Sequence, residues 1–368
     1  MKKEDLEVNS EDNHWLDWQP WKSLENYGFL KNGYAWYQTH FKISEVKKSL
    51  YLILTGFQDE VSIYLNGRYV KSGRNNLRCE VSSYLMKGDN LLMVLVENGG
   101  HHCGGEKYFN GINSPVYLSF EEKNLELKEW KRRLIPETYP EASLIKGERS
   151  EIRAEFDDSD WEKVRVDEKF DSRLLKNPYE ECFVWYRTEI PADFREKGLS
   201  LDFEGGMSSK IYLFVNGKFS GLRENTFLSL PFSFDLTDKI KTGKNSLVIG
   251  IKADRWVTYF GLNGKVKITI HDICLNNNWK VKEGISGQNK GYFKLDFDDS
   301  DWEEVEVNKK EDSPGSLVWF RKRVKIETIS PYVAPLRLTL KNACEKALIY
   351  FNGVLIGRYS EKGGQALS

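Results

Sequence analysis

Apolar and polar residues alternate with a period of two along much of this chain. In the stretch KIYLFVNG, Ile211, Leu213 and Val215 would share one face of a strand, with aromatic residues on the other face. This period is that of a β-strand, whose successive side chains point to opposite faces. Runs with a helical period are short, and strands do not alternate with helices as a parallel barrel requires. The pattern predicts an all-β fold of short antiparallel strands.

One segment occurs twice, as FDDSDWEKVRV at 156–166 and as FDDSDWEEVEV at 297–307. Each copy is polar and then aromatic, which indicates a turn whose carboxylates accept hydrogen bonds from backbone N–H groups. Trp161 and Trp302 would then anchor these turns in the core. Aspartates also bind Ca²⁺, but the segment lacks the Gly and the distal Glu of an EF-hand loop. A structural role is therefore favoured over a calcium or sugar site.

Two further landmarks recur in three copies with similar spacing. The first is a strand containing Trp and a second aromatic residue, and the second is an Asn-Gly turn between alternating runs. The strands are AWYQTHF at 35–41, VWYRTEI at 184–190 and VWFRKRV at 318–324, and the turns begin at Asn66, Asn216 and Asn352. Asn-Gly supplies two residues that tolerate positive φ, as a type I′ hairpin turn requires. The repetition indicates one module used three times.

Each module is expected to hold about eight short strands, and a jelly-roll β-sandwich fits that number. The predicted fold is therefore all-β, with three tandem jelly-roll β-sandwich modules. Charged and Asn-rich stretches between the repeats mark the boundaries. The modules are predicted at 13–121, 125–273 and 277–368.

A fourth landmark is a Lys/Gly/Asn turn that leads into an apolar strand. It occurs at 87–98 and 241–253, and a third copy would fall beyond Ser368. The third module is therefore expected to be truncated. We expect a partner, another copy of the chain, or residues 1–13 to complete it, because an unfinished sheet leaves an exposed edge.

Charge and cysteine content exclude several functions. The net charge is −1 and the pI is about 6.6, so no basic field would hold nucleic acid or an anionic membrane. The five cysteines lie far apart without a CxxC pair, which indicates free thiols in a reducing compartment. The chain has no apolar signal segment and no membrane-spanning run, and a cytoplasmic location is expected.

Three stretches resemble the C-terminal, non-catalytic region of β-galactosidases of glycoside hydrolase family 35. They are NYGFLKNGYAWYQTHF at 26–41, LMVLVENGGHHCGGEKYFNGINSPVYLSF at 92–120 and YFNGVLIGRYSEKGGQ at 350–365. The resemblance covers the chain from about residue 14 to its end. This sequence departs from the family's pattern at Gln38, where Arg is usual, and at Gly364, where Pro is usual.

The resemblance implies an accessory β-sandwich part, a subunit or a fragment, of a β-galactosidase-like enzyme, built of jelly-roll modules of the galactose-binding-domain-like type. The family's catalytic pair of Glu residues belongs to a (β/α)₈ barrel, which needs about 250 residues of alternating strand and helix. The chain has no such stretch, so neither catalytic residues nor a cofactor are expected in it. A separate catalytic barrel chain is the expected partner, with a β-galactoside or oligosaccharide as the ligand and a homo-oligomer as a further possibility. The alternative is a stand-alone, lectin-like carbohydrate-binding protein.

Sugar binding would need exposed aromatic faces and nearby hydroxyl-binding groups. The residue types that fit, on predicted loops, are Trp256, Tyr259, Asn263, Tyr108, Phe109 and Asn110. Packing of these residues against a neighbouring module is the structural alternative.

His101, His102 and Cys103 form the densest group of metal-ligating residue types. Adjacent side chains of a strand point to opposite faces, and Zn²⁺ ligands are usually spaced by two or more residues. No metal site is therefore predicted. The resemblance places this Gly-flanked loop near the barrel of the enzymes, which implies a role for His101 and His102 in shaping a partner's cleft.

Overall fold

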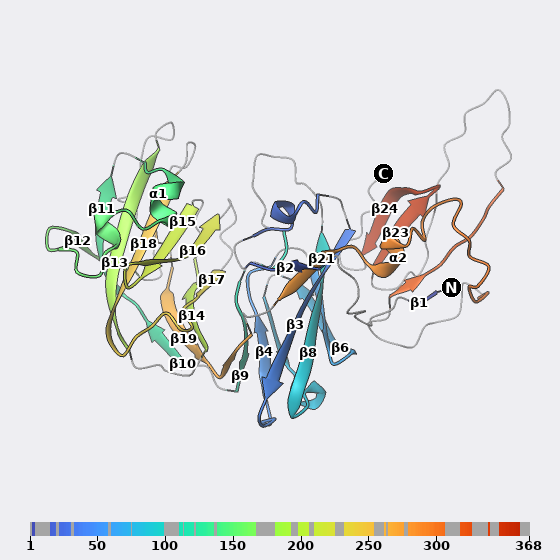
Figure 1. Ribbon diagram of the computed structural model, residues 1–368, viewed down its shortest axis with the longest axis horizontal. Helices are drawn as coiled ribbons and strands as arrows, with labels where there is room; N and C mark the ends of the chain where they lie inside the picture. The colour runs from blue at the N-terminus through green and yellow to red at the C-terminus, as the bar shows by residue number, and fades with distance from the viewer. Residues whose placement is uncertain are drawn as a thin grey trace. The chain divides into compact units, whose positions relative to one another are not determined.

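The computed structural model describes most of the chain in two compact units (Figure 1). One unit is Asn9–Glu283, and the other combines Met1–Val8 with Gly284–Ser368. The described residues are 2–3, 15–19, 22–30, 33–57, 60–74, 76–98, 110–112, 114–120, 123–135, 138–166, 181–192, 198–205, 210–224, 232–253, 261–262, 264–275, 279–305, 317–325, 338 and 346–360.

The first sandwich of the larger unit consists of a six-stranded and a four-stranded antiparallel sheet. The six-stranded sheet has the order β2 (Leu16–Asp17), β21 (Lys280–Glu283), β3 (Gly33–Ile43), β8 (Gly88–Asn98), β5 (Glu60–Leu65) and β6 (Arg68–Arg74). The four-stranded sheet has the order β20 (Ile273–Cys274), β9 (Val116–Ser119), β4 (Tyr51–Leu54) and β7 (Leu77–Glu80). Two short 3-10 helices, η1 (Glu25–Tyr27) and η2 (Ser82–Tyr84), connect strands.

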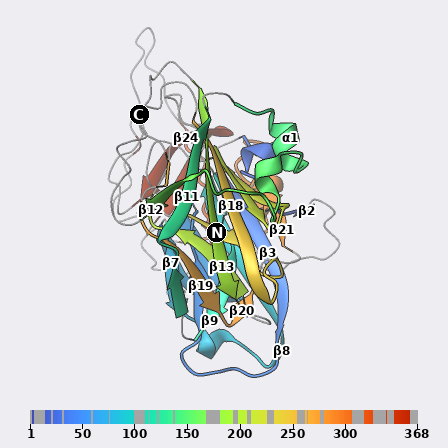
Figure 2. The same cartoon turned by 90° about the vertical axis from the view of Figure 1, so that its left-hand side faces the viewer.

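The second sandwich repeats this arrangement. Its six-stranded sheet has the order β12 (Glu162–Arg165), β11 (Glu129–Ile135), β13 (Cys182–Ala192), β18 (Gly243–Ala253), β15 (Lys210–Val215) and β16 (Lys218–Glu224). Its four-stranded sheet has the order β10 (Lys123–Glu126), β19 (Val266–His271), β14 (Gly198–Phe203) and β17 (Phe232–Asp235). Figure 2 views the second sandwich from the side of its six-stranded sheet.

Each sandwich has its own core between its two sheets, built from the alternating residues that the sequence pattern predicts. Ile211, Leu213 and Val215 of β15 all lie in the core of the second sandwich, together with residues of β14 and β19. The equivalent strand β5 contributes Ile63 and Leu65 to the core of the first sandwich. The expected all-β fold of antiparallel sandwiches is confirmed, because every sheet pairing in the described residues is antiparallel.

The second sandwich also carries an aromatic layer on the outer face of its six-stranded sheet. Trp185 and Phe214 project to this face, because their neighbours on β13 and β15 point into the core. A short helix, α1 (Glu141–Ile145), and the 3-10 helix η3 (Ser150–Ile152) cover this layer with Leu144 and Ile152. The polar-then-aromatic repeat follows directly, and it contributes Trp161 to the same layer.

The three Asn-Gly turns have the predicted conformation. In each turn both residues have positive φ, as a type I′ turn requires. The φ values are 52° and 75° at Asn66 and Gly67, 50° and 78° at Asn216 and Gly217, and 47° and 85° at Asn352 and Gly353.

The Asn of each turn in the larger unit also binds the start of a long neighbouring strand, which is β8 in the first sandwich and β18 in the second. Asn66 Nδ2 donates to Asn90 Oδ1 at 2.9 Å, and Leu91 N donates to Asn66 Oδ1 at 2.9 Å. The same two bonds recur in the second sandwich, from Asn216 Nδ2 to Asn245 Oδ1 at 2.8 Å and from Ser246 N to Asn216 Oδ1 at 3.1 Å. The Asn of the Lys/Gly/Asn turn is therefore the partner of the Asn-Gly turn.

One segment completes the first sandwich although it follows the second in sequence. We call residues 273–283 the strap; it consists of β20, Leu275, Trp279 and β21 among its described residues. β20 pairs with β9 of the four-stranded sheet, and β21 pairs with β3 of the six-stranded sheet. The strap therefore closes both sheets of the first sandwich.

The segment 123–135 performs the same task in the second sandwich, through β10 and β11. The corner between the strands is alike in both. Leu127 N donates to Val266 O and Leu275 N donates to Val116 O, each at 2.8 Å. The boundary predicted at 277 falls inside the strap, whereas the compact units divide between Glu283 and Gly284.

The smaller unit is described as two strand pairs and a helical turn. β1 (Lys2–Lys3) pairs with β22 (Val318–Trp319), and β23 (Lys346–Phe351) pairs with β24 (Val354–Ser360). α2 (Ser286–Asn289) precedes the second copy of the repeated segment. A third jelly-roll module in this unit stays a prediction.

Candidate functional site

Tyr117 lies on β9, where the two sandwiches of the larger unit meet. Its neighbours Val116 and Leu118 point into the core of the first sandwich, so Tyr117 points outward. Tyr117 is nevertheless only 2% exposed, because strands of the second sandwich cover it. An outward-facing aromatic ring that is fully covered identifies a built contact between the two sandwiches.

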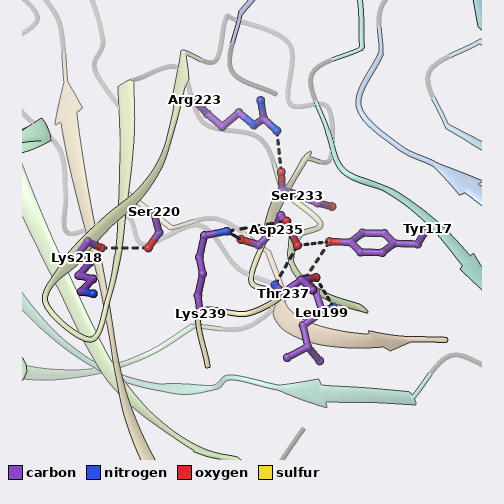
Figure 3. Close-up of polar contacts among 9 residues, drawn as sticks. All are labelled: Tyr117, Leu199, Lys218, Ser220, Arg223, Ser233, Asp235, Thr237 and Lys239. Carbon is purple, nitrogen blue, oxygen red and sulfur yellow. Dashed lines mark hydrogen bonds and ion pairs between the residues drawn. The ribbon is translucent and has the colours of Figure 1, made fainter. Parts of the chain in front are cut away.

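The Tyr117 hydroxyl is held by acceptors of the second sandwich (Figure 3). It lies 2.9 Å from the Leu199 carbonyl oxygen and 3.0 Å from Asp235 Oδ1, which share its one proton. The same Asp235 oxygen accepts a bond from Thr237 N at 3.0 Å, and Lys239 Nζ lies 3.9 Å from Oδ2. Burial, and after it the Asp235 charge, raises the pKa of Tyr117 far above its usual value. Tyr117 therefore remains a hydrogen-bond donor at any physiological pH.

The face of the Tyr117 ring stacks on His271 of β19. The ring centroids are 4.0 Å apart and the planes differ by 9°. His271 Nε2 lies 2.9 Å from Ser200 Oγ, a pairing that in an open cleft would suggest a nucleophile and its base. Here Ser200 is 2% exposed and His271 3% exposed, so no substrate reaches them. The pair therefore lies within the packed contact, where it supports the ring stack.

Gly198 lets the two sandwiches approach one another at this point. A Cβ atom at this position would lie 2.9 Å from Tyr117 Cδ1 and 3.2 Å from the backbone nitrogen of Cys274. The first distance is shorter than real Cβ contacts, and the second atom belongs to the strap. The absence of a side chain at 198 is therefore required by both the ring and the strap.

A polar row crosses the outer face of the four-stranded sheet of the second sandwich. Thr269 Oγ1 contacts Asp202 Oδ2 and lies 2.8 Å from Asn124 Oδ1, and Ser233 Oγ donates to Asp202 Oδ1 at 2.6 Å. Thr269 and Ser233 are buried, whereas Asn124 is exposed. Each buried hydroxyl has a partner, so the row is stable without a ligand.

A buried cation stands next to this row. Arg223, on β16, donates from Nη2 to the Ser233 carbonyl oxygen at 3.0 Å (Figure 3). Its guanidinium lies 5.5 Å from the centroid of the Phe234 ring. Burial lowers the pKa of Arg223 to about 9. The side chain therefore still carries its charge at neutral pH.

The repeated segment forms an ion-pair lock with the Trp-containing strand. Arg187, on β13, places Nε 3.0 Å from Asp158 Oδ2, and Lys131 Nζ lies 2.5 Å from Asp158 Oδ1. The same guanidinium donates to the carbonyl oxygens of Glu151 at 3.2 Å and Ala154 at 2.6 Å. Arg187 thus binds the segment that covers the aromatic layer to the sheet beneath it. We call Arg187 and Asp158 the first lock.

The second copy of the segment forms the equivalent Arg–Asp pair, with a different second cation. Arg321 Nε lies 3.0 Å from Asp299 Oδ2, and Arg323 Nη2 lies 3.0 Å from Asp299 Oδ1. Arg321 also donates to the carbonyl oxygens of Tyr292 and Lys294. The hydrogen bond from Arg321 holds the pKa of Asp299 below its usual value. We call Arg321 and Asp299 the second lock.

The first sandwich lacks both partners of a lock. Gln38 stands on β3 at the position of Arg187, and no FDDSDW segment precedes it in the sequence. Gln38 is buried, and its Oε1 has no hydrogen-bond donor among the described residues. In the two copies whose repeated segment is described, the Arg and the Asp are bonded to one another, and Gln38 replaces the Arg in the first sandwich.

The predicted turn chemistry of the repeat is confirmed. Ser159 N donates to Asp157 Oδ1 and Ser300 N donates to Asp298 Oδ1, each at 3.0 Å. Trp161 is 4% exposed and anchors its turn. Because cations occupy both carboxylate oxygens of the next aspartate in each copy, the structure favours the structural role over a calcium site.

Most of the predicted sugar-binding and cleft-shaping residues lie outside the described part of the chain. These are Trp256, Tyr259, Asn263, Tyr108, Phe109, His101 and His102. Their roles stay predictions.

Asn110 is described, and it is 1% exposed. Its carbonyl oxygen accepts a bond from Leu24 N at 2.9 Å, and its Nδ2 donates to Asn98 Oδ1 at 3.2 Å. Asn98 Nδ2 in turn donates to the Phe29 carbonyl oxygen at 3.0 Å. In the structure these two amides fasten the segment around η1 to the first sandwich.

The described residues contain neither a cluster of metal ligands nor a membrane-spanning helix. No group of three metal-ligating side chains lies close enough together there to hold a metal ion. No helix of the described ranges is long and apolar enough to cross a membrane.

Both sandwiches of the larger unit match a known protein family. Residues 8–102 and 148–255 match the family described as "Beta-galactosidase second all-beta domain". The two matched ranges fall on the first and the second sandwich, and together they span more than half of the chain.

One relative is a beta-galactosidase of Thermoanaerobacter pseudethanolicus, 32% identical over 106 residues. That match covers 27% of this chain and 14% of the relative, so the chain matches only about a seventh of that protein's length.

Among solved structures, a beta-glucuronidase of an uncultured Clostridium sp. is 16% identical, with a TM-score of 0.32, over 41% of this chain and 29% of that one. A beta-glycosidase of Bacteroides vulgatus is 20% identical, with a TM-score of 0.30, over 40% and 20%. Likeness at this level carries no argument about assembly or substrate.

The fold and the family match define a β-sandwich region of the kind that belongs to glycoside hydrolases. The chain belongs to the family of beta-galactosidase second all-beta domains, because that family matches more than half of it. Membership of glycoside hydrolase family 35 stays a prediction.

The residues of the inter-sandwich contact were not among the sequence candidates. Tyr117 and His271 lie at the outer faces of their strands, where a polar or aromatic residue is ordinary. Asp158 was assigned to the turn, but its partner Arg187 was not identified. A comparison of the repeats within this sequence could have identified Arg187, because Gln38 replaces it in the one copy that has no FDDSDW segment.

Proposed function

We propose that this chain is the accessory β-sandwich part of a β-galactosidase-like glycoside hydrolase. It docks a separate (β/α)₈ catalytic chain and shapes the carbohydrate-binding cleft of that chain. The observation that supports this most directly is the match of both sandwiches to a beta-galactosidase all-beta domain. The role is that of a scaffold, so what matters is a fixed geometry.

The larger unit has the features that a rigid scaffold needs. The strap starts two residues after His271 and returns to the first sandwich, so the two sandwiches are connected at both ends of the second one. Tyr117 is buried between them with its hydroxyl and its ring face both engaged. Breaking the contact would leave buried polar groups without partners, which costs about 1–3 kcal/mol for each group.

The described carboxylates also favour a structural role. A glycosidase needs two carboxyl groups on either side of one sugar bond, and one of them must be free to act as an acid. Three half-buried carboxylates in the described part of the chain, those of Asp158, Asp299 and Asp202, are held by cations or hydroxyl groups. Catalysis by a partner fits this arrangement better than catalysis by the chain itself.

The test is capture of the partner with the full-length tagged chain as bait, from the cells that produce it. We expect a barrel-type glycosidase in the eluate, identified by mass spectrometry, with activity on a chromogenic β-galactoside. The capture is repeated in excess galactose, which leaves a protein–protein contact intact. A chain that sediments as a monomer and ignores every co-expressed β-galactosidase barrel would refute the proposal.

Galactose also separates this proposal from the lectin alternative. If galactose released the captured enzyme, the chain would bind through sugar rather than through a docking surface. Isothermal titration of the chain alone with galactose or lactose provides the second readout. We expect no heat of binding, whereas a saturable heat would establish the lectin function.

A further inference from the structure

The three Asn-Gly turns share one backbone conformation but differ in what holds the Asn side chain. The φ values of the three Asn residues, 52° at Asn66, 50° at Asn216 and 47° at Asn352, lie close together. Glycine follows each of them, also with positive φ. The backbone of the turn is therefore the same in all three copies, and the contacts of the carboxamide are what distinguish them.

The carboxamide of Asn66 is held at both of its polar atoms. Its Nδ2 donates to the Tyr84 carbonyl oxygen and to Asn90 Oδ1, each at 2.9 Å. Its Oδ1 accepts a bond from Leu91 N at 2.9 Å. The carboxamide therefore cannot rotate without breaking three hydrogen bonds.

Asn216 is held by the same three kinds of bond. Its Nδ2 donates to the Lys239 carbonyl oxygen at 3.2 Å and to Asn245 Oδ1 at 2.8 Å, and its Oδ1 accepts a bond from Ser246 N at 3.1 Å. Like Asn66, it is half-buried. The fixed carboxamide is thus a common property of the two sandwiches of the larger unit.

Asn352 lies in the turn between β23 and β24, and it is exposed. No hydrogen bond joins its carboxamide to any residue in the described part of the smaller unit. A Cβ atom at Gly353 would have no neighbour within 4 Å, so the space beside the turn is open. The Asn352 carboxamide is therefore free to rotate toward the backbone of the next residue.

An Asn side chain that can rotate in this way reacts with its own backbone. The nitrogen of Gly353 gives up its proton and forms a bond to Cγ of Asn352, and Nδ2 leaves with that proton as ammonia. Water then opens the resulting succinimide ring at one of its two carbonyl carbons, which produces aspartate or isoaspartate. The attack requires the two reacting atoms to meet in the correct direction, and glycine places no side chain in the way.

We propose that Asn352 is a self-modification site of this chain, whose side-chain amide is lost through this ring, whereas the amides of Asn66 and Asn216 are retained. Water is the only co-reactant. The hydrogen bonds of the two held residues must break before their rings can close, and no such bond delays the reaction at Asn352. This reactivity is independent of the proposed function.

The isoaspartyl product would alter the hairpin of β23 and β24. It adds a methylene group to the backbone of a two-residue turn whose flanking residues, Phe351 and Val354, are paired. β23 also carries Tyr350, whose ring centroid lies 5.9 Å from that of Trp319 and whose hydroxyl accepts a bond from Gln288 Nε2 at 2.8 Å. Modification should therefore loosen both the hairpin and its contact with the aromatic rings of the smaller unit.

The test follows the three turns in one sample of the full-length protein. The protein is aged in mildly alkaline buffer and digested at acidic pH, and peptide mass spectrometry measures the fraction of each turn that carries a carboxyl group. We expect the amide of Asn352 to be lost at least about tenfold faster than those of Asn66 and Asn216, because three hydrogen bonds protect each of these. In urea, where no turn is held, the three rates should become similar.

Two variants assign the signal and test its cause. Asn352→Gly keeps the positive φ of the turn and cannot form the ring, so its peptide should keep a constant mass. Asn90→Ala removes one acceptor of the Asn66 amide, so the rate at Asn66 should rise severalfold while the rates at Asn216 and Asn352 stay unchanged. Anion exchange separates the modified wild type, and amide hydrogen exchange of this form should be faster in β23 and β24 than in the unmodified protein.

Two results would overturn the inference. A rate at Asn352 as slow as the rates at Asn66 and Asn216 in the folded protein, with fast loss in urea, would mean that this carboxamide is held in solution. Three equally fast rates in the folded protein would mean that the hydrogen bonds of the larger unit do not protect their turns.

Discussion

The first lock gives the sharpest test of how the repeated segment works. Asp158→Asn keeps the size of the side chain and removes the charge that faces Arg187 and Lys131. Arg187 would keep its bonds to the two backbone carbonyl oxygens, so the segment should loosen rather than unfold. The change therefore isolates the ion pair.

The expected cost follows from burial. An exposed ion pair contributes about 0–1 kcal/mol, and the loss of one partner of a buried pair costs about 3–5 kcal/mol. The side chain of Arg187 is 6% exposed and that of Asp158 is 21% exposed, so the pair lies between these limits. We expect Asp158→Asn to lower the free energy of unfolding of the second sandwich by about 2 kcal/mol.

The assay is urea unfolding of the full chain, with amide exchange of β13 used to assign the transition. With a slope of about 3 kcal/mol per M, the midpoint should fall by roughly 0.7 M. Asp160→Asn is the matched control, because Asp160 lies in the same turn, is 68% exposed and sits 3.8 Å from Arg133. This control should change the free energy by less than about 0.5 kcal/mol.

A double variant tests the pairing itself. Arg187→Gln reproduces the first sandwich, where Gln38 stands without an aspartate. Combined with Asp158→Asn, it should cost about 1–2 kcal/mol less than the sum of the two single changes, because contacting residues are not additive. Strict additivity, or an Asp158→Asn variant as stable as the control, would refute the lock.

Three other predictions concern the remaining contacts. Gly198→Ala forces a methyl group against Tyr117, so the free energy of unfolding should fall by about 1–3 kcal/mol, and the melting temperature should fall with it. An unchanged melting temperature would contradict the close approach. Asn245→Ala removes a side chain that bonds Asn216 and its own turn, so urea unfolding should show a loss of about 2 kcal/mol, and a loss below about 0.5 kcal/mol would show the turn to be self-sufficient. The pKa of Asp299 is lowered in the folded state, so its carboxylate stabilises the fold above about pH 4, and this stabilisation is lost as the pH falls further. The free energy of unfolding of Asp299→Asn should therefore change less with pH in this acidic range than that of the wild type.

The sequence was sufficient for the features that depend on neighbouring residues. Alternation predicts strands, and Asn-Gly predicts type I′ turns, because both are properties of a few adjacent residues. The same holds for the capping aspartates Asp157 and Asp298, whose partners lie two residues away. Repetition then extended these local features to whole sandwiches.

The candidate site was predicted less well, for a physical reason. Asn110 looks like a loop residue that could bind a hydroxyl group, yet in the structure it is buried against Asn98. Tyr117 looks like any aromatic residue of a strand, yet it joins two sandwiches. The sequence gives the chemical type of a side chain, but the packing of the sheets decides which residues that side chain contacts.

The strap shows most clearly what the sequence determined and what only the tertiary structure decided. Its Leu and Trp resemble those of the segment 123–135, but the sequence predicts only a module boundary there, at 277, whereas the structure shows a strand, a corner and a strand. By position it precedes the third module, yet it completes the first sandwich. Strands that pair can lie far apart in the chain, because the pairing is formed by backbone hydrogen bonds. β3 and β9 can therefore pair with any strand that the fold places beside them. The strap follows β19 directly in the chain, and it reaches that edge beside the close packing of Tyr117 on Gly198 and His271.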